Sequence, residues 1–177
     1  MPTPSARYLE DDDRSLLRAF ACSTGPWYED EVERFIRDRL IARHAARRRH
    51  TDHRIIGLED PERGLLAVTA HESELTRAGD RALTSTLWIV AAVTTEVRGA
   101  LLPDVDLGDG RPVTLGRYLA EVTFSDVFDT GRDPVVRAIV ARENTRSLAL
   151  CQRVGLTIEQ ADADRRYVQR LGLIAPD

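Results

Sequence analysis

The chain lacks lysine altogether and has very little asparagine and cysteine. All 25 basic side chains are arginine, and the single asparagine is Asn144. Because lysine and asparagine have AT-rich codons, a GC-rich genome accounts for both shortages. The two cysteines, Cys22 and Cys151, are too few for a disulfide framework and suit a reducing compartment.

Long apolar runs are also missing. The longest, residues 87–93, is too short to cross a bilayer, and the first fourteen residues are acidic, without the apolar stretch of a secretory signal. We therefore expect a cytoplasmic protein with no membrane partner. The four histidines lack the spacing of metal ligands, so no metal is expected.

The composition is that of a folded globular chain. Of the 177 residues, 42% are hydrophobic and 31% are charged, and a chain of this length builds one sizeable core. We therefore expect a single domain over residues 1–177. The formal net charge of −4 offers no basic surface for nucleic acid, and the arginine-rich run at residues 43–50 is typical of a solvated helix end. No nucleic-acid partner is expected.

Hydrophobic periodicity predicts seven strands and four helices. Apolar residues at helical spacing predict one long helix over residues 27–49, whereas the β-branched run at 87–93 is typical of a strand buried on both faces. In chain order, the predicted elements are a strand at 6–10, a helix from 12, the helix at 27–49, strands at 54–58 and 65–70, a loop at 72–81, the strand at 87–93, an irregular loop at 102–112, a helix at 113–128, a strand at 135–140, a helix from 144 or 145 to 155, and strands at 156–158 and 167–171. This order predicts an α/β fold with a mixed sheet and helices on both of its faces.

The segment ENTRSLALCQRVGL, residues 143–156, carries the most specific motif. It resembles the Asn-x-x-Ser/Ala-x-x-Leu-Tyr-x-Lys/Arg-x-Gly-Phe pattern that follows the fifth strand of the GNAT superfamily of acyl-coenzyme A-dependent N-acetyltransferases. The residues in register are Asn144, Ser147, Leu150, Cys151, Arg153, Gly155 and Leu156. An ordinary helix with an asparagine cap and a glycine terminator is the alternative explanation.

A second segment resembles the loop in which GNAT proteins hold the pyrophosphate of coenzyme A. Residues 111–116 follow the Arg/Gln-x-x-Gly-x-Gly/Ala pattern, but Thr114 replaces the first glycine and Pro112 removes one N–H donor. A rival register places the end of the strand and the start of the loop at residues 93–99, which makes 100–110 an insertion. Both registers can hold together. The alternative is an ordinary surface loop.

The resemblance, strongest over residues 87–155, implies a mostly antiparallel central sheet of six or seven strands flanked by about four helices. Acetyl-CoA would lie between the fourth and fifth strands, and an amine acceptor would approach near the first two helices. The implied cofactor-binding residues are Val93, Arg98, Arg111, Val113, Thr114, Leu115, Gly116, Arg117, Asn144 and Ser147. A homodimer is compatible with this reading.

The chain departs from the family at the residues that handle protons. Cys151 occupies the place of the tyrosine that usually protonates the departing thiolate, and it is a candidate for that role or a small packing residue. No carboxylate precedes the fourth strand, so Glu72 and His71, at the end of the third strand, are the nearest candidates for the base. Glu96 is a further alternative, but it lies where the family has an exposed acid in its loop. The acceptor would meet Trp27, Tyr28, Glu29 and Asp30, where two aromatic rings beside two carboxylates suit a cationic amine.

The expected function is transfer of an acetyl group from acetyl-CoA to an amine of a small molecule or a peptide N-terminus. Because the glycine, the tyrosine and the base are all replaced or missing, the alternative is a GNAT-like domain that binds coenzyme A or a protein partner without turnover.

Overall fold

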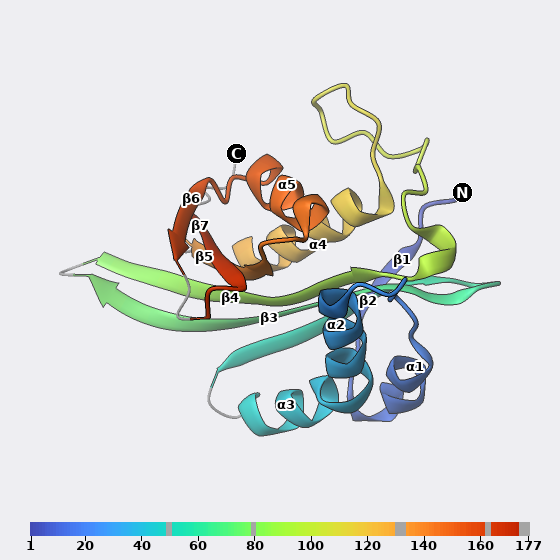
Figure 1. Ribbon diagram of the computed structural model, residues 1–177, viewed down its shortest axis with the longest axis horizontal. Coiled ribbons are helices and arrows are strands. Elements are labelled where there is room, and N and C mark those ends of the chain that lie inside the picture. Colours follow the sequence, from blue (N-terminus) through green and yellow to red (C-terminus); the bar gives the residue numbers. More distant parts are fainter. Residues whose placement is uncertain (49–50, 79–80, 130–133, 162–163, 174–177) are drawn as a thin grey trace.

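The computed structural model contains one seven-stranded sheet with helices on both faces (Figure 1). The structure describes residues 1–48, 51–78, 81–129, 134–161 and 164–173. The strand order across the sheet is β1-β2-β3-β4-β5-β7-β6, and every neighbouring pair is antiparallel except β4 and β5, which are parallel. The mixed, mostly antiparallel sheet is therefore confirmed.

The elements follow the order that the sequence predicts. The strands are β1 (Ser5–Tyr8), β2 (Asp52–Asp60), β3 (Gly64–Ala78), β4 (Arg81–Val93), β5 (Pro134–Ala141), β6 (Ile158–Ala161) and β7 (Tyr167–Leu173). The helices are α1 (Arg14–Ala19), α2 (Trp27–Asp38), α3 (Leu40–Arg47), α4 (Leu115–Phe128) and α5 (Thr145–Arg153), with 3₁₀ turns at Asp11–Asp13 and Thr95–Val97.

Two predicted elements are wrong in detail. The helix expected over 27–49 is interrupted at Arg39, whose φ of −122° starts α3 in a new direction and allows both Leu40 and Ile41 to be buried. The loop expected at 72–81 is largely strand, and the buried Ser73 bonds Thr86 of the neighbouring strand at 2.9 Å. Residues 79 and 80 of that loop lie outside the described residues.

The helices divide between the two faces of the sheet. Helices α1, α2 and α3 cover one face, and α4 and α5 cover the other (Figure 1). Val90 and Ala92 of β4 belong to the core beneath α1 to α3, whereas Trp88 packs against α4 and α5. Trp88 and Val90 therefore point to opposite faces of the sheet, although residues two apart in a regular strand share a face. The reason is a bulge: β4 has an extra residue, Ile89, where its register with β3 shifts.

Strands β4 and β5 part at this bulge. Their pairing runs from Thr84 opposite Pro134 to Trp88 opposite Ala138, but β4 continues to Val93 and β5 to Ala141. From there β5 is paired only with β7 in the described part of the sheet. A bulge bends its strand, so the two strands diverge at the centre of the sheet.

Candidate functional site

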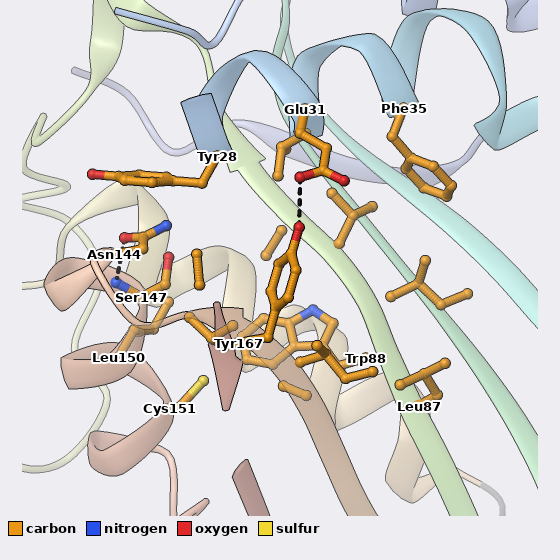
Figure 2. Close-up of a pocket in the computed structure, with 18 of the residues that line it drawn as sticks. Tyr28, Glu31, Phe35, Leu87, Trp88, Asn144, Ser147, Leu150, Cys151 and Tyr167 are labelled. Atoms are coloured by element: carbon orange, nitrogen blue, oxygen red, sulfur yellow. Dashed lines mark hydrogen bonds between the residues drawn. The ribbon is translucent and has the colours of Figure 1, made fainter. Parts of the chain in front are cut away.

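A pocket of about 470 Å³ opens where β4 and β5 part. Its walls are residues 87–91 of β4, residues 138–141 of β5, the inner side of α5 and the inner side of α2, with Tyr167 from β7 (Figure 2). The pocket therefore passes between two strands and meets helices from both faces of the sheet.

Asn144 and Ser147 lie together at this pocket, as the motif predicts. The Asn144 side chain caps α5 by accepting a hydrogen bond from the Ser147 backbone N–H at 3.1 Å. Gly155 follows the helix with a φ of +91°, which glycine adopts without strain. The motif thus fixes both ends of a helix whose first turn lines the pocket.

Cys151 also lines the pocket, but its surroundings are apolar. The side chain packs in the core with Trp88, Val140 and Leu156. Burial raises the pKa of the Cys151 thiol to about 11, so the thiol keeps its proton at neutral pH. A role in packing and a role as proton donor are both compatible with this state.

The start of α4 lies against the end of β4. A Cβ atom on Gly116 would be 3.9 Å from Cγ2 of Val93, which brings together two of the predicted cofactor residues. Most of the first N–H groups of α4 are already bonded: Leu115 N–H to the Ala100 carbonyl at 3.0 Å, and Arg117 N–H to Thr114 Oγ1 at 3.3 Å. This end of α4 is therefore a poorer anion cradle than an uncapped helix start.

The side chains beside this helix start have different surroundings. Val113 and Leu115 are core residues with fully buried side chains. Arg117 Nη2 donates to Asp109 at 2.7 Å, whereas 73% of the Arg111 side chain is exposed. Among these predicted cofactor residues, Arg111 has the most accessible charge.

Three other predicted site residues hold the turn before α2. Arg98 Nη1 donates to Glu29 at 2.7 Å, and Asp30 accepts a hydrogen bond from Ser23. None of these residues lines the pocket. The structure thus brings Arg98 and Glu29 together, but as an ion pair that holds the first turn of α2 and not as part of the pocket.

The aromatic pair at the start of α2 does reach the pocket region. Trp27 Nε1 donates to Glu143 at 2.7 Å, and the Trp27 ring meets the Tyr167 ring edge to face with centroids 5.7 Å apart. Tyr28 lines the pocket itself. These contacts dock the start of α2 on β7 and on the turn before α5, so α2 forms one wall.

Sequence reasoning missed a hydrogen bond across the pocket. The Tyr167 hydroxyl donates to Glu31 Oε2 at 2.6 Å (Figure 2). Burial and the neighbouring Glu31 carboxylate raise the pKa of Tyr167 to about 12. Because these residues are far apart in sequence, no local pattern pairs them.

Three arginines also line the pocket and were missed. Arg34, Arg39 and Arg43 come from α2, from the break after it and from α3. In the sequence they belong to a charged helix face that is typical of a solvated surface, so no local signal marks them as pocket residues.

Glu72 requires a correction. It is 5% exposed on the face of β3 beneath α3, where Arg43 and Arg47 bind its two oxygens at 2.8 and 2.9 Å. Burial acts to raise the pKa of Glu72, but the arginines lower it below the usual range, which weakens the carboxylate as a base. Glu72 does not line the pocket, and its neighbour His71 faces the opposite side of the sheet, where it binds Asp126 at 2.6 Å.

Within the described residues, no group of three His, Cys, Asp or Glu side chains is placed to hold a metal. No helix in the same part of the chain combines the length and the apolar character needed to span a bilayer.

Comparison with known proteins identifies the fold. No protein-family model matches the chain, and no curated protein sequence matches it. Among solved structures, a Desulfovibrio desulfuricans protein assigned to the GNAT acetyltransferase family has a TM-score of 0.63 at 15% identity, over 95% of this chain and 96% of that one. The chain therefore has the GNAT fold.

Two further similar structures are complexes. A mutant of the AtaT toxin, bound to acetyl-CoA and to the C-terminus of the antitoxin AtaR, has a TM-score of 0.51 at 16% identity, over 93% of this chain and 91% of that one. The KacTA–DNA complex has a TM-score of 0.57 at 16% identity, over 94% and 96%. The AtaR segment and the DNA are partners of those proteins, and for this chain the expected absence of a nucleic-acid partner stays a prediction.

Proposed function

We propose that this chain, which has the GNAT fold, transfers an acetyl group from acetyl-CoA to the amine of a small molecule or a peptide N-terminus. The observation that carries the proposal is the parting of β4 and β5 at Trp88 around a pocket that opens toward both layers of helices. A substrate from each side of the sheet can meet in such a pocket.

The residues at the gap suit the pantetheine arm of acetyl-CoA. Past Trp88, β4 pairs with β3 on one side and with no strand on the other in the described part of the sheet. An extended chain that carries amides can hydrogen-bond to a strand edge as another strand would. We propose that Asn144 and Ser147, which line the pocket, and Val93 contact this arm, and that Gly116 and Arg111 bind the pyrophosphate.

Acetyl-CoA supplies the acetyl thioester, whose carbonyl carbon bonds to the acceptor nitrogen as the carbon–sulfur bond breaks. The departing sulfur then needs a proton, and the nitrogen loses one. The Tyr167 hydroxyl gives the first, and the Glu31 carboxylate takes the second and returns it to Tyr167 along the 2.6 Å hydrogen bond. Cys151 packs among apolar side chains, and in this proposal it has a packing role only.

Acetyl-CoA binding tests the proposal first. At a hundred times its dissociation constant, acetyl-CoA should stabilise the fold by about 2.7 kcal/mol, seen as a rise in melting temperature. Ser147→Phe, which fills the pocket, should weaken binding measured by calorimetry, whereas Ala149→Phe on the exposed side of the same helix should not.

Turnover is then measured as release of free thiol from acetyl-CoA with a panel of amines. No binding heat and no thermal shift at millimolar acetyl-CoA would overturn the proposal. Binding without thiol release on any amine would favour the alternative, a domain that binds coenzyme A without turnover.

A further inference from the structure

The wall of the pocket formed by α2 and α3 is basic. In the described part of the chain its charged side chains are Arg34, Arg39 and Arg43, with Glu31 as the one carboxylate. This is the face from which the acceptor is expected to enter. The two carboxylates that the sequence suggested for an acceptor, Glu29 and Asp30, are instead turned to the loop before α2.

The geometry of the two helices brings these arginines together. Glu31 and Arg34 are three residues apart, so they lie on one face of α2. Helix α2 ends before Arg39, whose φ is −122° and ψ −26°, and Arg43 of the following helix α3 lines the same pocket. A continuous helix over 27–49 would not turn at this point.

These guanidinium groups retain unused donors. No hydrogen bond or ion pair joins the Arg34 or Arg39 side chain to another described residue. Arg43 spends Nη2 on Glu72, but its Nε is buried without a hydrogen-bond partner in the described structure. By contrast Arg37, on another side of α2, donates to the Arg18 carbonyl at 2.9 Å and to Glu33 at 3.0 Å.

We propose that the acceptor amine carries an oxyanion group, a carboxylate or a phosphate, which Arg34, Arg39 and Arg43 bind while Glu31 holds the ammonium. The inference rests on the proposed acetyl transfer. Guanidinium groups bind carboxylate and phosphate through paired, charge-assisted hydrogen bonds, and those of Arg34 and Arg39 are exposed and have no competing partner among the described residues. A purely cationic amine would instead face three like charges.

Matched amine pairs test this assignment. Glycine is compared with glycinamide, and phosphoethanolamine with ethanolamine, by the rate of thiol release from acetyl-CoA. At least one oxyanion-bearing amine should show a kcat/KM about tenfold or more above its neutral partner, and the preferred pair tells carboxylate from phosphate. Equal kcat/KM within both pairs would overturn the inference while leaving acetyl transfer intact.

Two arginine variants near the end of α2, one at the pocket and one away from it, supply a matched control. Arg39→Gln should raise KM for the preferred amine about tenfold and leave acetyl-CoA affinity unchanged, whereas Arg37→Gln should change neither. An Arg39→Gln enzyme with wild-type KM would also contradict the assignment.

A readout that needs no turnover separates the two proposals. Inorganic phosphate should raise the melting temperature of the wild type and of Arg37→Gln more than that of an Arg34→Gln/Arg39→Gln double variant. If the chain fails to bind acetyl-CoA but shows this difference, acetyl transfer fails and the anion site stands. If phosphate stabilises all three proteins equally, the anion site fails.

Discussion

The hydroxyl of Tyr167 donates a hydrogen bond to the carboxylate of Glu31 across the pocket at 2.6 Å and so joins β7 to α2. The contact places a protonated acid beside a carboxylate in the pocket between the described parts of β4 and β5. In the proposed reaction, this contact would carry a proton between the acceptor and the core of the pocket.

Tyr167→Phe removes the proposed proton donor and keeps the ring. We expect kcat to fall by about 10²–10⁴, the usual contribution of general acid catalysis, with acetyl-CoA affinity almost unchanged. The free energy of unfolding should fall by about 1 kcal/mol or less, because one partly exposed hydrogen bond is lost. Steady-state kinetics and calorimetry on the purified variants measure these effects.

Cys151→Ala is the matched comparison within the same pocket. If the thiol only packs, kcat should stay near the wild type, and the small cavity should cost about 1 kcal/mol of stability. The reverse pattern, a slow Cys151→Ala enzyme and an active Tyr167→Phe enzyme, would return the proton transfer to Cys151.

The sequence predicted the frame of the fold better than its site. Helix α5 was predictable because both of its ends depend on local residues. Asn144 caps the start of the helix, and Gly155 adopts the positive φ that follows its end, and neither needs a distant partner. The break at Arg39 was not, because the residue has no breaking tendency of its own and the burial of Leu40 and Ile41 decides it. The strand over residues 72–78 was missed because polar residues such as Glu72 and Ser73 find their partners only in the folded structure.

The site residues depended on long-range contacts. Arg34 and Arg37 look alike in the sequence, yet one lines the pocket and the other binds Glu33 and the Arg18 carbonyl. Glu72 had the right chemistry for a base, but α3 covers it with two arginines. Residue type therefore indicated the candidates, and tertiary packing selected among them.

Gly116→Ala tests whether the start of α4 holds the pyrophosphate. The added methyl group meets nothing nearer than Val93 Cγ2 at 3.9 Å, so the fold should keep its stability. It would crowd a ligand at the helix start, and acetyl-CoA affinity should fall about tenfold, equivalent to about 1.4 kcal/mol. Ser125→Ala, exposed near the other end of α4, is the control. Unchanged affinity in both variants would place the pyrophosphate elsewhere.

Asn144→Ala separates the capping role of this residue from a role at the pocket. Loss of the hydrogen bond from Ser147 N–H should lower the free energy of unfolding by about 1 kcal/mol, measured by urea denaturation. Thr114→Ala, which uncaps α4 in the same way, sets the scale. Because Asn144 lines the pocket, acetyl-CoA affinity should fall by more than this stability loss explains. An affinity equal to the wild type would leave Asn144 as a cap alone.

Asp126 on α4 is expected to contribute to the loss of stability in acid. It is 8% exposed, and its oxygens accept hydrogen bonds from His71 at 2.6 Å, from Arg54 at 2.9 Å and from Tyr8. Burial acts to raise the pKa of Asp126, but these hydrogen bonds and the Arg54 charge lower it below the ordinary value of 3.8. Because the folded pKa lies below the unfolded one, the stabilisation is complete above about pH 4–5 and is lost as the pH falls through the folded pKa.

Asp126→Asn removes this charge with little change of shape. At pH 7 it should cost about 1.5–3 kcal/mol of unfolding free energy, since the buried His71 ring and the partly exposed Arg54 guanidinium lose their ionised partner. Urea denaturation from pH 7 to pH 3 should show a shallower acid loss than in the wild type, and the difference between the two curves isolates Asp126 from the other carboxylates. Tyr8→Phe, which deletes one of the hydrogen bonds, should give an intermediate curve. Parallel curves for Asp126→Asn and the wild type would show that other carboxylates carry the acid sensitivity.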